Sequence, residues 1–218
     1  MQKAILFDMD GVLVHSEPVI LKSAIQGLKE FGVEAAAPDF LEFVGAGEDR
    51  FVGGVAEKHG VKYVPEMKRR VYEIYCSLVD SELILFDEVP ETLLSLHESG
   101  YRIAIASSAD RIKVDANIRA AGIPDDAVDA ILSGEDIERK KPFPDIFLLA
   151  SERLGVSPSY SVVVEDAVNG IHAATAAGMK SVGVTSYFPA EKLLSEGASA
   201  AVSQIRELPG TLDQIFKA

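Results

Sequence analysis

Two aspartates, two positions apart, directly follow the first apolar run of the chain. Residues 4–7 are uncharged and apolar, and Asp8, Asp10 and Gly11 come after them. Four consecutive apolar residues are typical of a strand buried on both faces, and open α/β sheets carry their chemistry at the carboxyl ends of such strands. In an extended chain both carboxylates point to the same side, where they repel each other unless a cation or a proton intervenes. The pattern indicates a divalent-metal site or an acid beside a nucleophile, unless Asp-Gly is only the turn that ends the strand.

Polar residues also follow two later apolar runs. Ser107 comes after residues 102–106, and Glu165 and Asp166 come after residues 161–164. Lys141 stands in a loop before a predicted helix. Since the strands of a parallel sheet end at the same edge, we expect these groups to converge with the two aspartates although they are far apart in the sequence.

The two aspartates fit the chemistry of phosphoryl transfer. Asp8 would attack phosphorus and form an aspartyl-phosphate. Asp10 would protonate the leaving oxygen and would then activate a water molecule for the second step.

The other polar groups fit the same reaction. Mg²⁺ held by Asp8, Asp166 and Glu165 would offset the repulsion between the carboxylate and the phosphate. Ser107 and Lys141 would hold the phosphate oxygens as negative charge develops on them.

The alternation of apolar runs and helical patterns predicts the fold. Strands are indicated at residues 4–7, 102–106, 130–132, 161–164, 181–184 and, weakly, 200–202, with helices between them. This order predicts an α/β protein with a doubly wound parallel sheet. Residues 16–85 interrupt it after the first strand with helical patterns, at 39–44, 48–59 and 65–78 among others, and with no convincing strand. We therefore expect a core domain of residues 1–15 and 86–218 and an inserted all-helical domain of residues 16–85.

The composition excludes several partners. With 218 residues and a net charge of −13, the chain should repel nucleic acid and anionic membranes, and no apolar run approaches the ~18 residues of a membrane span. The first residues lack a basic region followed by an apolar stretch, so we expect no secretory signal. Cys76 is the only cysteine, which excludes an internal disulfide and fits a reducing compartment, and its helical context favours a role in packing. These features predict a cytoplasmic protein, and nothing in the sequence demands an oligomer, so we expect a monomer.

A phosphorylated substrate is also an anion, so it would need local positive charge to bind to this acidic chain. A small phosphorylated metabolite would be held by the metal and by a few local lysines, such as those of Arg139-Lys140-Lys141. The second basic cluster, Lys68-Arg69-Arg70, is better explained as a solvated face.

Four short motifs resemble those of the haloacid dehalogenase superfamily. They are Asp8-Met9-Asp10-Gly11-Val12, Ser107, Lys141-Pro142-Phe143-Pro144-Asp145 and Val164-Glu165-Asp166, in the order of the family's motifs one to four. The resemblance implies that Asp8 and Asp10 serve phosphoryl transfer rather than dehalogenation, and that Asp10 also lends its backbone carbonyl to a Mg²⁺ ion. The helical insertion resembles the C1 cap of the beta-phosphoglucomutase-like subfamily.

Three positions depart from the family pattern. Lys140 replaces the glycine before the motif-three lysine, Asp87-Glu88 replaces a Pro-Gly at the end of the cap, and Ala167 replaces a common serine. None of these changes removes a catalytic group.

The resemblance leaves a phosphatase and a phosphomutase as alternatives. In beta-phosphoglucomutases a cap histidine lies ten residues after the acid/base aspartate, and Ile20 occupies that position here. Hydrolysis is therefore favoured, with a sugar phosphate as the expected substrate. Residues 45–54 and 107–117 are similar to the dehalogenase-like domain of plant suppressor-of-quenching proteins, which indicates a sub-branch and not a substrate. A regulatory module without turnover is a third alternative, but it would have no need of Asp8 and Asp10 together.

Two residues of the cap are candidates for contacts with the leaving group. Glu48 and Arg50 stand in a glycine-rich segment. The alternative is that Glu48 and Asp49 only mark the start of a helix.

The core supplies the remaining substrate-binding candidates. Gly11 and Ser108 adjoin the catalytic residues, and Arg111 follows Asp110, which fits a helix cap equally well. His172 is assigned to packing.

Overall fold

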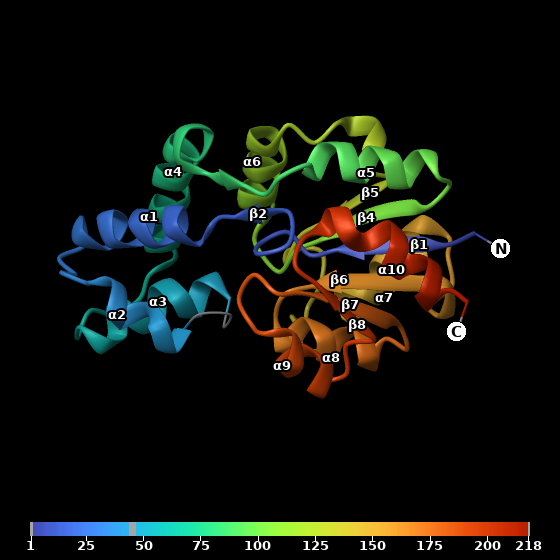
Figure 1. Cartoon of the computed structure of the whole chain (residues 1–218). Helices are drawn as coiled ribbons and strands as arrows, with labels where there is room; N and C mark the ends of the chain where they lie inside the picture. The colour runs from blue at the N-terminus through green and yellow to red at the C-terminus, as the bar shows by residue number, and fades with distance from the viewer. Residues whose placement is uncertain (1, 44–46, 218) are drawn as a thin grey trace.

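Six parallel strands form the sheet at the centre of the protein, whose computed structural model describes residues 2–43 and 47–217 (Figure 1). The strand order is β5-β4-β1-β6-β7-β8. The central strand β1 pairs on both sides, so that Phe7 lies opposite Ile105 and Val164. The predicted α/β class is confirmed. The strands are β1 (Ala4–Phe7), β4 (Arg102–Ala106), β5 (Ala130–Leu132), β6 (Ser161–Glu165), β7 (Lys180–Val184) and β8 (Ala200–Val202).

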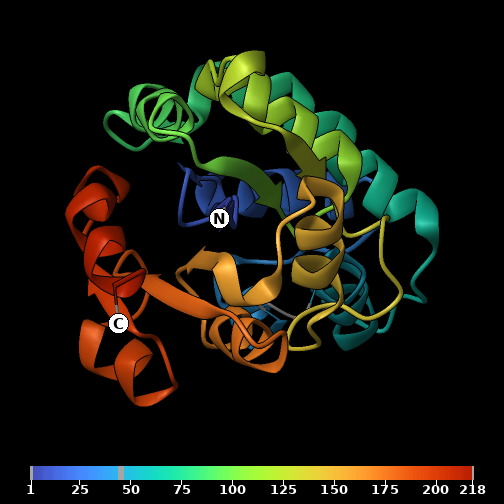
Figure 2. The same cartoon turned by 90° about the vertical axis from the view of Figure 1, so that its right-hand side faces the viewer.

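Helices cover both faces of the sheet, as Figure 2 shows. Ile5 and Phe7 face an apolar layer that includes α5 (Val89–Glu98), α6 (Arg111–Ala121) and α10 (Leu208–Ile215). Leu6, between them, faces the opposite layer, which includes α7 (Asp145–Leu154) and α8 (Val168–Ala176). Burial on both faces explains why the strands are continuous apolar runs. The shorter elements are α9 (Ala190–Ser195) and the 3₁₀ turns Asp125–Ala127, Pro158–Tyr160 and Ile205–Glu207.

A block of helices lies beyond the carboxyl ends of the central strands (Figure 1). It contains α1 (Glu17–Lys29), α2 (Ala37–Phe40), the 3₁₀ turn Leu41–Phe43, α3 (Glu48–Lys58) and α4 (Pro65–Glu82). Its apolar side chains form a cluster of their own, with Phe40, Val55 and Tyr75 among the buried members. The boundaries predicted for a separate domain, residues 16–85, remain a prediction. Within the described part of the chain, no helix is long and apolar enough to cross a membrane.

The helix predicted at 39–44 differs from the structure. Helix α2 begins earlier, at Ala37, with Pro38 in its first turn, and it gives way after Phe40 to a 3₁₀ turn. The predicted end at Val44 and Gly45 lies outside the described residues. Proline is favoured in the first turn of a helix, which explains the earlier start.

Two short strands join the helical block to the sheet. β2 (Val14–His15) and β3 (Ile84–Leu85) pair antiparallel, with Val14 opposite Leu85. The expectation that residues 16–85 contain no strand is therefore wrong at β3. A strand of two residues is too short to show a periodic pattern, so the sequence gives no sign of it.

Candidate active site

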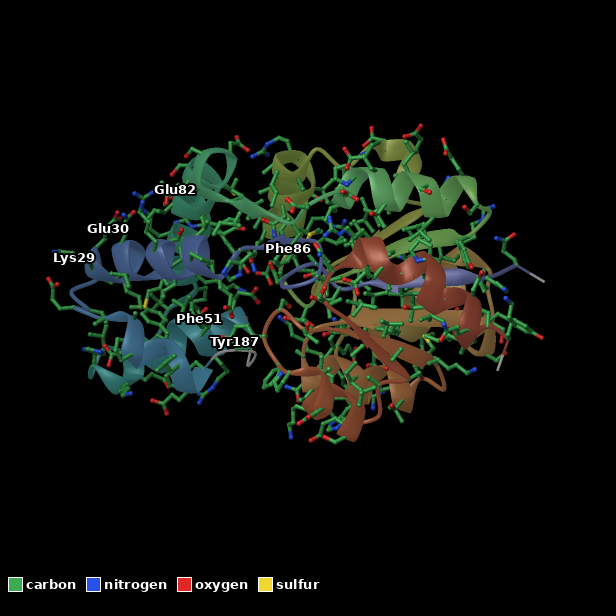
Figure 3. All side chains as sticks on the ribbon, viewed as in Figure 1. Lys29, Glu30, Phe51, Glu82, Phe86 and Tyr187 are labelled. Atoms are coloured by element: carbon green, nitrogen blue, oxygen red, sulfur yellow. The ribbon has the colours of Figure 1, made fainter. Side chains whose placement is uncertain are left out.

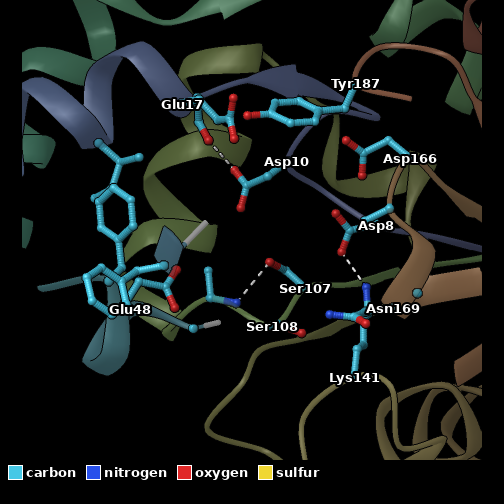
Figure 4. Close-up of a pocket in the computed structure, with 18 of the residues that line it drawn as sticks. Asp8, Asp10, Glu17, Glu48, Ser107, Ser108, Lys141, Asp166, Asn169 and Tyr187 are labelled. Atoms are coloured by element: carbon cyan, nitrogen blue, oxygen red, sulfur yellow. Dashed lines mark hydrogen bonds and ion pairs between the residues drawn. The ribbon is translucent and has the colours of Figure 1, made fainter. Parts of the chain in front are cut away.

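A cavity of about 900 Å³ lies where the carboxyl ends of β1, β4 and β6 meet the helical block. Figure 4 shows the predicted catalytic residues around it. The strand order explains this convergence, because β1 lies between β4 and β6 in the parallel sheet. The lining residues from the sheet edge and its loops include Asp8, Asp10, Ser107, Ser108, Lys141, Glu165 and Asp166.

Three buried carboxylates lie together at this edge. Asp8, Glu165 and Asp166 each offer an oxygen, and these oxygens lie within 4.8 Å of one another. Burial raises the pKa of Asp8 to about 7, although Lys141 opposes this shift. Burial and the neighbouring Glu165 also raise the pKa of Asp166. Three carboxylates together carry more negative charge than one lysine can offset, and their oxygen donors fit a hard divalent cation.

Lys141 is the cation that the chain itself supplies to this cluster. Its Nζ donates hydrogen bonds to Asp8 Oδ1 at 2.5 Å and to Glu165 Oε1 at 2.6 Å. Burial acts to lower the pKa of Lys141, but the two carboxylates outweigh it and raise that pKa above its ordinary value. Lys141 therefore stays charged and fixes the orientation of Asp8.

Two glycines leave room for the acids. A Cβ on Gly170, in the first turn of α8, would lie 1.9 Å from the Glu165 carboxylate. A Cβ on Gly11 would lie 1.9 Å from Asp166 Oδ2, and Gly11 also has a φ of +79°. The expectation that Gly11 binds the substrate is not supported by this placement, because its Cα packs against Asp166 and it is not among the residues that line the cavity.

Asp10 lies in a different polar environment from Asp8. Lys113 Nζ donates to Asp10 Oδ2 at 2.7 Å, and Asn117 Nδ2 donates to Oδ1 at 3.3 Å. Ser16 Oγ donates a short hydrogen bond to the same Oδ1. The Tyr75 hydroxyl of α4 donates in turn to Asn117, so the helical block supports the position of Asp10 through α6.

Lys113 and Asn117 are site residues that the sequence analysis missed. Both are buried, and they lie four residues apart on the inner face of α6, next to Val114 and Ala121. This spacing places them on one face of the helix. A lysine and an asparagine on an otherwise apolar helix face were the available signal.

Ser107 and Ser108 offer hydroxyl groups to the cavity. Ser107 Oγ accepts a hydrogen bond from the Ala109 backbone at 3.2 Å, which leaves its own proton to donate. Ser108 Oγ is buried and has no hydrogen-bond partner among residues 2–43 and 47–217. Buried hydroxyls without a partner are uncommon, and these two are suited to the oxygens of an anion.

Glu48 is the acid that the helical block brings to the cavity. It begins α3, and its carboxylate lies 3.9 Å from Lys113 Nζ and 4.0 Å from Lys140 Nζ. Burial raises the pKa of Glu48 above its ordinary value, although both lysines oppose the shift. Lys140, which replaces the family's glycine, thus contacts the helical block.

The structure does not bring the two predicted arginines to the cavity. Arg50 lies on the outer face of α3, where it is exposed and 4.0 Å from Glu57. The Arg111 guanidinium donates to Asp136 at 3.1 Å and to the Ile131 carbonyl at 3.1 Å. These carboxylates and the carbonyl compete for the guanidinium groups, so the expected contacts with the substrate are not supported.

Of the two residues that were assigned to packing, His172 does not pack in the interior and Cys76 does. His172 is exposed on the outer surface, and its ring lies 2.8 Å from Glu196, so that it forms an ion pair when protonated. Cys76 is half-buried and packs against the apolar cluster of the helical block, as expected.

The mouth of the cavity carries residues that the sequence analysis did not assign to it. His15 of β2 and Glu17, the first residue of α1, line the cavity, and Tyr187 lines it from the loop after β7. The His15 ring stacks on Phe86. Tyr187 forms a hydrogen bond with Glu17, and burial raises the pKa of that carboxyl.

Comparison with known proteins gives consistent matches. The family model for haloacid dehalogenase-like hydrolases matches residues 5–184. The chloroplastic protein suppressor of quenching 1 of Arabidopsis thaliana is 43% identical over 96% of the chain, which spans only 20% of that protein's length. A phosphoglycolate phosphatase of Pectobacterium atrosepticum is 33% identical over 84% of the chain and 80% of its own length. A putative beta-phosphoglucomutase of Thermotoga maritima has a similar structure, with a TM-score of 0.78, 28% identity and coverage of 99% of this chain and 100% of its own.

Proposed function

Because the chain belongs to the haloacid dehalogenase-like hydrolase family, we propose that it is a phosphatase that uses Asp8 as its nucleophile. The observation that carries this proposal is the arrangement of Asp8. It lies between Lys141 and two further buried acids, and a second aspartate with different surroundings stands two residues away. The phosphoglycolate phosphatase among its relatives supports hydrolysis of a phosphate monoester.

In the first step Asp8 forms a bond to phosphorus. Lys141 holds Oδ1, which leaves Oδ2 to attack. The bond from phosphorus to the leaving oxygen breaks, and Asp10 donates a proton to that oxygen. Lys113 and Ser16 hold Asp10 in place for this transfer.

In the second step water replaces Asp8 on phosphorus. Asp10, now ionised, takes a proton from the water as its oxygen attacks, and the bond from Asp8 to phosphorus breaks. Ser107 and Ser108 donate hydrogen bonds to the phosphate oxygens in both steps, and the positive charge of Lys141 offsets the negative charge that develops there. Closure of the helical block over the cavity excludes other water molecules.

The acid cluster is proposed to hold Mg²⁺. Asp8, Glu165 and Asp166 would bind it, with the backbone carbonyl of Asp10 as a further ligand. The ion would supply positive charge that offsets the repulsion between the Asp8 carboxylate and the phosphate.

A phosphomutase is the second candidate, and the similarity to a putative beta-phosphoglucomutase favours it. Ile20, which takes the place of the mutase histidine, lines the cavity with an apolar side chain. His15 is the one histidine that lines the cavity among the described residues. The apolar side chain of Ile20 favours hydrolysis.

The test compares phosphate release with isomerisation. A panel of 4-nitrophenyl phosphate, phosphoglycolate, nucleotides and sugar phosphates is incubated with Mg²⁺ or with EDTA, beside a coupled assay for conversion of beta-glucose 1-phosphate. We expect phosphate release that EDTA abolishes. Isomerisation without release would favour the mutase, and neither activity would favour a binding module.

Replacement of the nucleophile gives a direct control. Asp8→Asn should lower turnover at least about 1,000-fold, because an amide cannot form the acyl phosphate. Its thermal unfolding should stay cooperative, since an amide of the same shape fills the site. Turnover that stays within tenfold of the wild type would exclude Asp8 as the nucleophile.

A further inference from the structure

Apolar side chains dominate the wall of the cavity that the helical block provides. Ile20, Leu41, Phe43 and Phe51 line it from the block, and Tyr187 lines it from the core. Figure 3 shows Phe51 and Tyr187 on the two sides of the junction. Leu41 is 71% exposed and Tyr187 is half exposed, whereas Ile20 and Phe43 are mostly buried, so solvent reaches this apolar wall mainly at Leu41 and Tyr187. An apolar wall inside a cleft is typical of a binding surface.

Few side chains on the same wall are polar, and each of them lies near a polar or charged neighbour. Ser16 donates to Asp10, Glu17 bonds to Tyr187, and Glu48 lies beside two lysines of the core. These are the polar side chains from residues 16–43 and 47–85 that line the cavity. Residues 44–46 are Val-Gly-Ala, which have no side-chain donor or acceptor.

This wall is poorly suited to a sugar. Each hydroxyl of a sugar that is buried there without a hydrogen-bond partner would lower the affinity about tenfold or more. Each methylene that is buried there would raise it by up to about fourfold. The balance therefore favours an apolar group next to the phosphate.

We propose that the site takes phosphate monoesters of apolar alcohols, alkyl or aryl, in preference to sugar phosphates. This inference rests on the proposed function for the position of the phosphate, and it replaces the sugar phosphate expected from the sequence. The phosphate lies against Asp8 and Lys141, and the apolar leaving group lies along Leu41, Phe43 and Phe51.

Binding is measured first, because it does not depend on turnover. Hexylphosphonate and ethylphosphonate carry the same head group and cannot be hydrolysed. With Mg²⁺ present, calorimetry should show that the hexyl compound binds at least about tenfold more tightly. Equal affinities would overturn the inference.

Turnover is compared on a matched pair of esters. Hexyl phosphate and glucose 6-phosphate are both phosphates of a primary alcohol with six carbons, but one carries an alkyl chain and the other a pyranose ring with four hydroxyl groups. We expect kcat/KM to be at least about tenfold higher for hexyl phosphate. A higher value for glucose 6-phosphate would overturn the inference.

A variant locates the effect in the cavity. Leu41→Gln should lower the ratio of kcat/KM for hexyl over ethyl phosphate by about threefold or more, because Leu41 packs on the distal carbons. Leu148→Gln is the control, since Leu148 is also exposed but lies on α7 and does not line the cavity. Equal losses for both esters in Leu41→Gln would assign Leu41 to closure of the cavity and would contradict the proposal.

Failure of the proposed function gives a different pattern. If hexylphosphonate binds more tightly than ethylphosphonate and no ester releases phosphate, the apolar site stands and the phosphatase is rejected. If esters release phosphate without any preference for the apolar ones, the phosphatase stands and the inference is rejected.

Discussion

Asp8 and Asp10 have opposite surroundings although they are two residues apart. Asp8 is buried among acids, and Lys141 is its cation. Asp10 is partly exposed and accepts hydrogen bonds from Lys113, Asn117 and Ser16. Different surroundings are what allow two neighbouring carboxylates to act as nucleophile and as acid/base.

Lys113 is expected to act through Asp10. Lys113→Met keeps the apolar stem and removes the charge, so Asp10 loses the donor to Oδ2. We expect kcat/KM for alkyl phosphates to fall about 100-fold. The value for 4-nitrophenyl phosphate should fall much less, because that leaving group departs without a proton. The measurement is the ratio of the two values.

Lys22→Met serves as the control for Lys113→Met. Lys22 lies on the surface of α1 and pairs with Glu82 at 2.6 Å, so its loss should leave both esters unaffected. Equal losses for alkyl and aryl esters in Lys113→Met would contradict a role through Asp10.

At the scale of elements, the strand register positions the acids and the first turn of α8 gives them space. Glu165 is the last residue of β6, and its carboxylate accepts a hydrogen bond from the Ala167 backbone N–H at 3.0 Å. Gly170 lies directly against it. The position of the Glu165 carboxylate therefore depends on a glycine, which has no side chain of its own.

Gly170→Ala should damage the site without damaging the helix. The added Cβ would lie 1.9 Å from the Glu165 carboxylate and must displace it, while alanine itself favours a helix by about 1 kcal/mol. We expect the Mg²⁺ concentration for half-maximal activity to rise at least about tenfold. Gly210→Ala in α10 is the control, because its Cβ would contact nothing within 4 Å. An unchanged Mg²⁺ dependence in Gly170→Ala would show that Glu165 is not a ligand.

Strand ends were predictable from the sequence, and helix faces were not. Asp8, Ser107 and Glu165 each follow a buried apolar run, and parallel strands bring such ends to one edge. Arg50 and Arg111 stand on helices, where a shift of one residue along the helix decides whether a side chain faces the cavity or solvent. Their competing partners, Glu57 and Asp136, are distant or unmarked in the sequence.

At the scale of the whole molecule, contacts between side chains connect the helical block to the core around the cavity. Lys68 of α4 pairs with Asp110 of the core at 2.8 Å, and Tyr75 bonds to Asn117. Lys68 belongs to a basic cluster that was predicted to be a solvated face, so its ion pair with the core corrects that prediction.

The sequence predicted the helical block because its periodicity is local. It did not predict the contacts, because they join residues that are far apart along the chain. The predicted cytoplasmic location and monomeric state remain predictions.

The acid cluster should make stability depend on pH and Mg²⁺ together. The pKa of Asp8 is raised to about 7 in the folded protein, so the folded state holds a proton that the unfolded state releases near pH 4. Without metal, the contribution of Asp8 to the free energy of unfolding is fully present below about pH 4, and it is lost as the pH rises through about 7. Mg²⁺ bound to the ionised carboxylates would restore this stability.

Thermal unfolding at two pH values checks this coupling. We expect Mg²⁺ to raise Tm clearly at about pH 8 and only slightly at about pH 5. The shift should be much smaller in Asp8→Asn, which lacks one of the three carboxylates. A Mg²⁺ effect of equal size at both pH values would contradict the raised pKa of Asp8.

The central claim is that phosphate passes through Asp8, and Asp10→Asn allows this to be observed. With 4-nitrophenyl phosphate the leaving group needs no proton, so the first step proceeds, whereas the second step lacks its base and slows. The variant is mixed with 4-nitrophenyl phosphate and Mg²⁺, quenched in acid and digested for mass spectrometry. We predict that the peptide containing Asp8 carries the mass of one phosphoryl group. If nitrophenol and phosphate are released by this variant and the Asp8 peptide stays unmodified throughout, the account is contradicted.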